Sequence, residues 1–354
     1  MSIAKITSKI KYIYHLMKAL KEQDKSVGGK GRRISFFTKL KYNVLGFSDK
    51  EIVYYNFPKN DYKKFISTAE RLKLEDVNGR FADILGEKVM LERIWGNFIY
   101  VPKTYCYINR GHFFDLDDLS EEFDLVSLLK EKGQLLTKPS RSGGGGHGIA
   151  SLRFKDNVFY INNKEYSECD FVDELRTYYD YLISEWIYPN DYAKKVFPLT
   201  TNTIRIVTVM NHESNKSEVL MAVHRFGTNK SIPVDNACSG GICSFVDIRN
   251  GICGPGHDMI HVGLKYEKHP ETGEVIDGLR IPNWEDVKHK MEHVHNCFPY
   301  YEFLAWDVVI TQDNKICILE INRGMDVHWL QVDKPMRNEK LGIYMRQKGL
   351  LRKW

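Results

Sequence analysis

The stretch Trp306-Asp307-Val308-Val309-Ile310 is followed, after polar residues, by Ile316-Cys317-Ile318-Leu319-Glu320-Ile321-Asn322. Two apolar runs around a polar tip at 312–315 predict an antiparallel hairpin. Side chains repeat every second residue along a strand, so Glu320 and Asn322 share one face. Asp307 lies on the partner strand and can meet them across the ladder. The hairpin therefore gathers two carboxylates and an amide.

These three polar side chains are costly to bury in an apolar hairpin without partners. A hard divalent cation such as Mg²⁺ satisfies them, because it takes oxygen ligands and leaves coordination positions for phosphate oxygens. We therefore predict that Asp307, Glu320 and Asn322 hold Mg²⁺. A solvent-facing polar edge explains this stretch equally well when it is taken alone.

A second informative stretch has a lysine at the end of a short buried strand, before a glycine cluster. Lys138-Pro139 leads into four consecutive glycines: Gly143, Gly144, Gly145 and Gly146. The backbone N–H groups of such a loop can close over phosphates, and the lysine adds a point charge. The spacing fits neither a Walker A loop nor a dinucleotide fingerprint. Four glycines are costly to order, so a ligand-gripping loop explains them better than a flexible surface hairpin.

A third stretch, residues 182–187, is an apolar strand that contains Glu185. The end of such a strand can present backbone groups to the edge of an adenine ring. Taken alone, an ordinary core strand with one exposed carboxylate is the better interpretation.

The composition sets limits on the class of protein. The chain has 354 residues, 43% hydrophobic and 27% charged, which is ordinary for a soluble globular protein of two or three domains. Its seven cysteines are odd in number and lack Cys-x-x-Cys spacing, which argues against a disulfide framework or structural zinc. The start of the chain lacks the apolar core of a signal peptide. We expect a cytoplasmic protein with reduced thiols.

The positive charge is concentrated in residues 1–48, which hold eleven Lys and Arg against two acidic residues. No recognised nucleic-acid motif accompanies this arm, so we expect no nucleic-acid partner. Residues 3–20 place apolar side chains at helical spacing with lysines between them, which predicts an amphipathic helix. We favour packing of its apolar stripe on the protein body. The alternative is a peripheral contact of residues 1–41 with the inner face of an anionic membrane.

The remaining pattern mixes helices with mostly antiparallel strands, which predicts an α+β fold. Helices are expected within 48–97 and at 166–179 and 284–297. Strands are expected at 100–109, 134–138, 181–187, 202–210 and 218–225, and hairpins at 149–162 and 303–321.

Taken in this order, the three stretches resemble the ATP-grasp superfamily. That superfamily has a lysine-proline strand end, a glycine-rich lid, a hinge glutamate and a terminal Asp…Glu-x-Asn metal set. An upstream lysine at the start of a helix belongs to the same pattern, and Lys88 is the candidate. The segments at 202–208, 234–241, 269–273 and 281–284 look like the sugar-transfer-associated group, which is linked to bacterial capsule and exopolysaccharide synthesis.

The resemblance implies an ATP-grasp fold, in which two α+β subdomains clamp ATP. We expect a helical basic region at 1–85, a subdomain with the lysine strand and glycine lid at 86–187, and a subdomain with the metal hairpin at 188–354. Lys88 and Lys138 would contact ATP, Glu185 would sit at the adenine and ribose, and the hairpin would hold one or two Mg²⁺ ions.

The resemblance also implies a carbon–nitrogen ligase. A substrate carboxylate takes the γ-phosphoryl group of ATP, and an amine then attacks the acylphosphate. Arg205 and Arg225 would grip the γ-phosphate or the substrate carboxylate; a structural ion pair is the alternative. The expected partners are a small-molecule or saccharide acceptor and an amine. A sugar or acid kinase, and a non-catalytic scaffold of polysaccharide assembly, are the alternative functions.

One departure from the superfamily lies just beyond the hairpin. Many ATP-grasp enzymes continue from the final asparagine into a Pro-Gly turn, whereas residues 323–326 here read Arg-Gly-Met-Asp. We hypothesise that Asp326, His328 and Gln331 face the acceptor.

Overall fold

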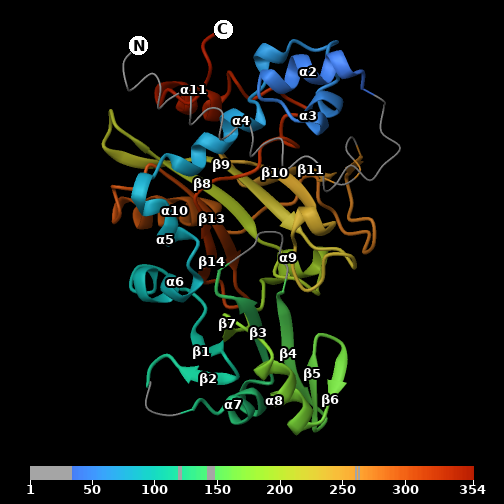
Figure 1. Cartoon of the computed structure of the whole chain (residues 1–354), viewed down its shortest axis with the longest axis vertical. Helices are drawn as coiled ribbons and strands as arrows, with labels where there is room; N and C mark the ends of the chain where they lie inside the picture. Colours follow the sequence, from blue (N-terminus) through green and yellow to red (C-terminus); the bar gives the residue numbers. More distant parts are fainter. Residues whose placement is uncertain (1–33, 119–121, 142–147, 260, 262–263) are drawn as a thin grey trace.

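Two antiparallel sheets and the helices around them make up the computed structural model, which describes residues 34–118, 122–141, 148–259, 261 and 264–354 (Figure 1). The predicted α+β class is confirmed. The amphipathic helix expected at 3–20 and the glycines at 143–146 lie outside the described residues, so those predictions stay untested.

The first sheet has seven strands in the order β2-β1-β7-β3-β4-β5-β6. Its strands are β1 (Thr104–Asn109), β2 (His112–Asp115), β3 (Gln134–Pro139), β4 (Ala150–Lys155), β5 (Val158–Ile161), β6 (Lys164–Tyr166) and β7 (Tyr181–Glu185). Helices α7 (Leu125–Lys132) and α8 (Glu168–Arg176) pack with it. The β4–β5 hairpin turns at Asp156 and Asn157, both at positive φ, as a tight two-residue turn requires.

The second sheet also has seven strands, in the order β12-β11-β10-β9-β8-β13-β14. They are β8 (Ile204–Asn211), β9 (Lys216–Phe226), β10 (Ile242–Asp247), β11 (Ile252–Asp258), β12 (Lys265–Tyr266), β13 (Phe303–Ile310) and β14 (Ile316–Asn322). The predicted tail hairpin is β13–β14, with Asp307 directly opposite Glu320. On its other side Asp307 lies opposite Arg205 of β8. Three charged residues therefore form one row across three strands.

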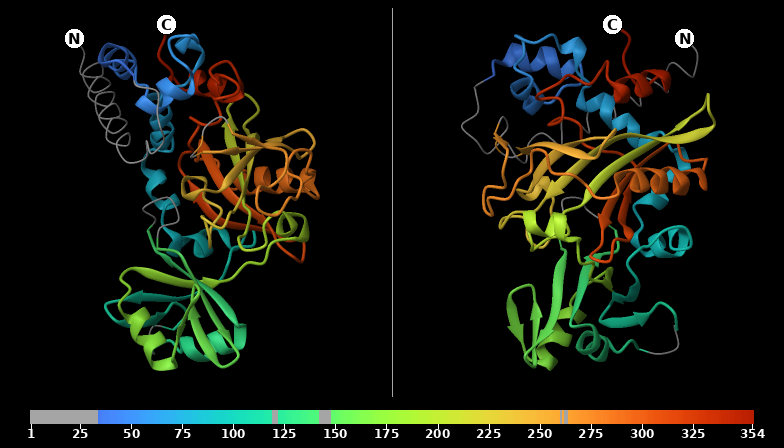
Figure 2. Two further views of the ribbon diagram at one scale, coloured as in Figure 1. Left: turned by 90° about the vertical axis from the view of Figure 1, so that its right-hand side faces the viewer. Right: turned by 180° about the vertical axis from the view of Figure 1, so that it is seen from behind.

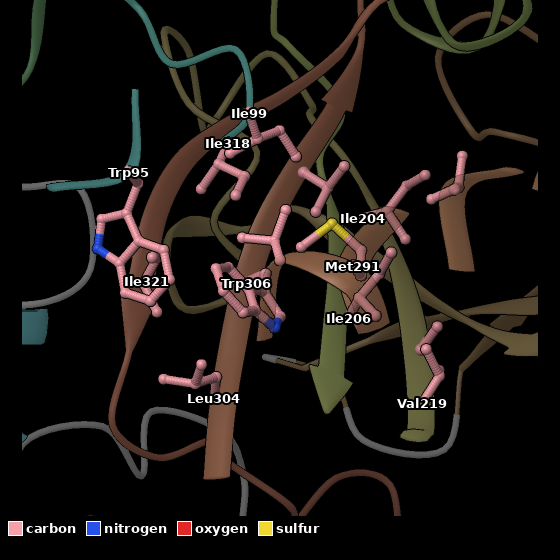
Figure 3. Close-up of a cluster of buried hydrophobic side chains, with 14 of the residues drawn as sticks. Trp95, Ile99, Ile204, Ile206, Val219, Met291, Leu304, Trp306, Ile318 and Ile321 are labelled. Atoms are coloured by element: carbon pink, nitrogen blue, oxygen red, sulfur yellow. The ribbon is translucent and has the colours of Figure 1, made fainter. Parts of the chain in front are cut away.

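The largest core lies under this second sheet (Figure 3). Trp306 of β13 is fully buried and packs edge-on against Trp95, with ring centroids 5.2 Å apart. Its indole N–H donates to Thr208 Oγ1 at 2.8 Å, so the one polar atom of the ring is satisfied. The helix α10 (Trp284–Asn296) contributes Met291 and Val294 to the same cluster. This packing fixes β13 and hence Asp307.

Short helices lead into the sheets. They are α2 (Phe36–Val44), α3 (Asp49–Tyr54), η2 (Tyr62–Lys64), α4 (Thr68–Arg71), η3 (Leu72–Asp76), η4 (Gly79–Phe81), α5 (Ala82–Leu85) and α6 (Lys88–Trp95). Ser48 and Glu51 form a capping box at the start of α3. Helix α6 buries Leu91 and Trp95 in the core of the second sheet, so it lies with that sheet although it precedes the first one.

The end of the chain is tied back onto these short helices. Arg337 forms a two-contact ion pair with Glu70, with N–O distances of 2.9 and 3.0 Å, and both side chains are buried. Gln331 is fully buried, accepts from the Ile66 N–H at 2.7 Å and donates to the Ile66 carbonyl at 2.8 Å. The hypothesis that Gln331 faces an acceptor is therefore wrong, because its amide binds the backbone of the N-terminal helices.

The two sheets lie one after the other along the long axis of the molecule, as Figures 1 and 2 show from three directions. The segment after β7 crosses from the first sheet to the second and carries α9 (Asp191–Val196). The last helix, α11 (Lys340–Gln347), packs at the far end beside the N-terminal helices. No helix of the described part of the chain is long and apolar enough to cross a membrane.

Candidate active site

A cavity opens where the two sheets meet, and it gathers the predicted site residues. Eight of them line it: Lys88, Lys138, Glu185, Arg205, Arg225, Asp307, Glu320 and Asn322. Lys138 and Glu185 come from the first sheet, whereas the arginines and the hairpin residues come from the second. Apolar side chains such as Leu136, Ile187 and Leu319 complete the walls. Such a lining suits a ligand that has a flat aromatic ring and a charged tail.

Two lysines sit at one end of the cavity. Lys138 ends β3, and Lys88 begins α6, where its backbone N–H donates to the Ser140 carbonyl at 3.1 Å. That bond ties the start of α6 to the segment just after Lys138, so the charge of each lysine acts on the other. Both lysines are only 7% exposed. Within the described ranges no carboxylate lies within ion-pair distance of either ammonium group.

Burial, together with the neighbouring charge of Lys88, lowers the pKa of Lys138 to about 8. Burial also lowers the pKa of Lys88, and the carboxylates of Glu320 and Asp307 oppose that shift. Two adjacent buried ammonium groups repel one another, so an anion placed between them relieves the repulsion. The pair is therefore suited to hold phosphate groups.

ATP binding is expected to weaken as the pH rises above about 8. Below that pH Lys138 is protonated in the free protein, and its charge is available to the phosphates. Above it the free protein must take up a proton on binding, so the Kd should rise up to about tenfold per pH unit. Isothermal titration calorimetry with a non-hydrolysable ATP analogue between pH 7 and 9.5 measures this slope.

Lys138→Arg is the matched control, because arginine keeps its charge over this range. Its Kd should stay flat with pH. An equally flat profile in the wild-type protein would contradict the assignment of Lys138 to the phosphates.

Glu185 is the last residue of β7 and also lines the cavity. Its carboxylate accepts from the Tyr100 hydroxyl at 2.7 Å and from the Lys103 N–H at 3.2 Å. These bonds fix the carboxylate and orient the strand end, Trp186 and Ile187, which also line the cavity. The resemblance placed an adenine and ribose here, and this arrangement leaves Glu185 as an acceptor for further hydroxyl groups.

The middle of the cavity holds a network of two arginines and two aspartates. Asp307 accepts from Arg205 through both carboxylate oxygens, one at 3.0 Å, and lies 2.9 Å from Arg225. Arg225 also lies 3.5 Å from Asp235 and donates to the Thr203 hydroxyl at 2.8 Å. Burial alone would raise the pKa of Asp307, but the two guanidinium groups outweigh it and hold that pKa below its usual value. Asp307 is therefore held in its ionised form.

This network limits what Asp307 can give to a metal ion. A carboxylate has about four lone-pair sites. In Asp307, Arg205 occupies two of these sites and Arg225 occupies a third. One site remains, and Glu320 and Asn322 line the same cavity as Asp307. The buried amide nitrogen of Asn322 has no hydrogen-bond partner among the described residues.

Two carboxylates and an amide oxygen around one cavity fit the oxygen preference of Mg²⁺. Mg²⁺ bound there would neutralise phosphate charge next to the arginines. The described residues contain no cluster of three or more His, Cys, Asp and Glu side chains suited to a metal. The predicted set, with its single amide, remains a prediction.

A second cavity adjoins the first and shares Arg205, Arg225, Asn236 and Asn322 with it. Asp326, expected to face an acceptor, lines this second cavity. His328 lies behind it, 3.2 Å from the Asp326 carboxylate, and supports that side chain.

Several residues at the site were not among the predicted functional ones. Tyr100 fixes Glu185, and Thr203 positions both Arg225 and, through its N–H, Asp235. Asp235 is a buried anchor for Arg225. Thr203 and Asp235 sit in the segments 202–208 and 234–241, which carry part of the family resemblance, but nothing in the local sequence pattern marks Tyr100.

The sequence matches the family described as sugar-transfer associated ATP-grasp over residues 67–340, well over half of the chain. The chain belongs to this family. The resemblance seen in the sequence is thereby confirmed, and the fold with it. No match to this chain is found among curated proteins.

Solved structures of other ATP-grasp proteins are similar at low sequence identity. N5-carboxyaminoimidazole ribonucleotide synthetase, PurK, in its ADP complex is 11% identical, covers 75% of this chain and 52% of its own, and has a TM-score of 0.42. The ATP-grasp ligase PsnB with its minimal precursor is 12% identical, covering 77% and 63%, with a TM-score of 0.41. VanG D-Ala:D-Ser ligase from Enterococcus faecalis is 13% identical, covering 74% and 62%, with a TM-score of 0.38. The chain thus spans about half to two thirds of the length of these structures.

Proposed function

We propose that this member of the family is an ATP-dependent carboxylate–amine ligase. It acts through an acylphosphate and modifies a bacterial surface polysaccharide or its sugar precursor, with a small-molecule or saccharide acceptor and an amine as substrates. The observation that carries the proposal is the meeting of two cavities at Arg205 and Arg225. One cavity has the buried lysines for phosphates, and the other has room for a second substrate.

The arginine pair would act at the point where charge develops. A carboxylate oxygen of the acceptor attacks the γ-phosphorus of ATP, the bond between that phosphorus and the β–γ bridging oxygen breaks, and ADP leaves. Arg205 and Arg225 face both cavities, so they can hold the incoming carboxylate and the transferring phosphoryl group together. A guanidinium binds either group through two parallel hydrogen bonds. Positioning and charge neutralisation account for most catalysis in phosphoryl transfer.

The second step forms the carbon–nitrogen bond. The amine nitrogen attacks the acyl carbon, loses a proton, and phosphate leaves with the electron pair of the C–O bond. Water must be kept from the acylphosphate during this step. The cavity lies between the two sheets, so closure of the first sheet on the second would exclude water.

ADP release is expected to require both a carboxylic acid and an amine, and this requirement is the test. A screen crosses uronic acids and their nucleotide derivatives with amino acids, and ADP is measured by a coupled assay. Added hydroxylamine should replace the amine and yield a hydroxamate of the acceptor, because it traps the acylphosphate.

Other outcomes would select an alternative function. ADP release with the acid or a sugar alone, and a stable phosphorylated product, would indicate the kinase. ATP binding without ADP release under any combination would indicate a non-catalytic scaffold.

Location is part of the proposal as well. We propose that the protein acts in the cytoplasm, where ATP and Mg²⁺ are abundant, and that residues 1–41 contact the inner face of the membrane. The lysines between the apolar residues of 3–20 support such a contact with anionic lipid.

A further inference from the structure

The second cavity has the dimensions of a small-molecule site. Its volume is about 490 Å³, within the ~300–1,000 Å³ typical of ligand pockets. It is built from parts of the chain that are far apart in sequence: the short helix η3, the strands β8 to β10 and the segment after β14. Gly324 lets that last segment lie against η3, since an added Cβ would come within 2.9 Å of the Glu75 side chain.

Arginines outnumber carboxylates in the lining, while Asp307 and Asp235, which pair with two of these arginines, lie outside it. Four arginines and two carboxylates face this cavity: Arg71, Arg205, Arg225, Arg323, Glu75 and Asp326. Arg205 and Arg225 sit at the wall shared with the nucleotide cavity. An anionic group bound there would lie next to the transferring phosphate, as a reacting carboxylate must.

A second part of the lining combines charged groups that already neutralise one another. Arg71 lies 3.1 Å from Glu75 and 3.6 Å from Asp326, and His328 supports Asp326 from behind. The Asp326 side chain keeps 44% of its surface exposed. A fixed set of donors and acceptors without surplus charge suits neutral hydroxyl groups better than a second ion.

A third wall is apolar and includes an aromatic ring. Trp329 packs on Phe245, with ring centroids 5.8 Å apart, and lies beside Val223 and Met325. A sugar ring has apolar C–H faces and a polar rim, so it matches a pocket with one aromatic wall and one hydrogen-bonding wall.

Resting on the proposed function, we infer that the second cavity is the acceptor site and takes a sugar acid in its pyranose form. The carboxylate of the sugar binds Arg205 and Arg225, its hydroxyl groups bind Asp326, Glu75 and Arg71, and its ring lies against Trp329. The short helices before the first sheet therefore take part in choosing the acceptor.

Binding to the full-length protein tests the class of ligand directly. The probes are D-glucuronate, D-galacturonate and D-mannuronate, each compared with its neutral parent sugar and with acetate, in the presence of a non-hydrolysable ATP analogue and Mg²⁺. Isothermal titration calorimetry should give a Kd at least tenfold lower for one of the sugar acids than for its parent sugar and for acetate. Equal binding of the parent sugar, or no binding of any of the three acids, would overturn the inference.

A variant pair locates the site. Asp326→Asn should raise the Kd of that sugar acid at least tenfold and leave the Kd of the ATP analogue unchanged. Asp333→Asn is the matched control, because Asp333 is also ion-paired on the same segment, with Lys265 at 2.8 Å, but lines neither cavity. A loss of sugar-acid binding in Asp333→Asn, or none in Asp326→Asn with an unchanged melting temperature, would contradict the placement.

The assays separate this inference from the ligase proposal. If a sugar acid binds and Asp326→Asn weakens it, but no amine yields a condensed product, the acceptor site stands and the ligase fails. If an amine and a non-sugar acid release ADP while the sugar acids neither bind nor react, the ligase stands and the sugar-acid site fails.

Discussion

Glu320→Gln is expected to lower Mg²⁺-dependent ATP turnover at least about a hundredfold. Losing a supporting group behind a metal ligand lowers metal affinity or activity about 10–100-fold, and Glu320 is a carboxylate of the hairpin that lines the cavity. The substitution keeps the size of the side chain and removes only its charge. The measurement is kcat for ADP release over a Mg²⁺ titration, and the Mg²⁺ concentration at half-maximal rate should rise as well.

Glu218→Gln provides the control for this effect. Glu218 lies on β9 of the same sheet, is exposed and lines neither cavity. Its replacement should leave both the rate and the Mg²⁺ dependence unchanged. A Glu320→Gln enzyme with wild-type Mg²⁺ dependence would show that the hairpin does not bind the metal.

Asp307 is a less clean probe of the same site. Its removal would leave Arg205 and Arg225 without their shared partner in a buried place, and unpaired buried charge is strongly destabilising. A loss of activity in an Asp307 variant would therefore mix metal binding with misfolding. Asp307 is the less clean probe because, in the cross-strand row, it lies between Glu320 and Arg205.

Arg205→Met is expected to lower kcat by about a thousandfold, the lower end of what an arginine contributes to phosphoryl transfer. Arg205 faces both cavities, so its charge acts on the transferring group and not on ATP binding alone. The values of kcat and kcat/KM for ATP should fall together, which marks an interaction made in the transition state. Arg205→Lys should recover only part of the rate, because an ammonium cannot make two parallel bonds.

Folding of the Arg205 variants can be checked separately. Asp307 keeps Arg225 at 2.9 Å when Arg205 is removed, so the carboxylate is not left alone. Arg249→Met is the matched control, because Arg249 makes the same two-contact pair with Asp247, at 2.7 and 3.0 Å, on the surface. The Arg249→Met variant should have wild-type values of kcat and KM. If Arg205→Met also kept wild-type kinetics, Arg205 would be only a structural partner of Asp307.

The tail hairpin shows how far local pattern carries a prediction. Alternation of apolar residues and a polar tip were enough to predict the pairing of β13 with β14 and the meeting of Asp307 with Glu320. The Arg205–Asp307 pair could not be found this way, because the two residues are separated by 102 positions. Their contact depends on the register of β8 with β13, which tertiary packing sets.

The pairing of β10 with β11 was not predicted, because the sequence of β11 does not read as a strand. Residues 254–256 read Gly-Pro-Gly, which interrupts a strand pattern and indicates a loop. In the structure Gly256 lies so close to β10 that an added Cβ would come within 2.6 Å of Ile242. Glycine is thus used here for close approach of two strands. The partners of Glu185 were missed too, because Tyr100 lies 85 positions away and before the first sheet.

The most direct test of the nucleotide clamp is calorimetric titration of the full-length protein with a non-hydrolysable ATP analogue, with Mg²⁺ and with EDTA. We predict one site per chain, with a Kd that weakens at least tenfold when Mg²⁺ is removed and in the Glu320→Gln variant. No binding by the wild-type protein, or binding that ignores both Mg²⁺ and Glu320, would contradict the central claim that ATP is held between the two sheets by the lysine pair and the metal hairpin.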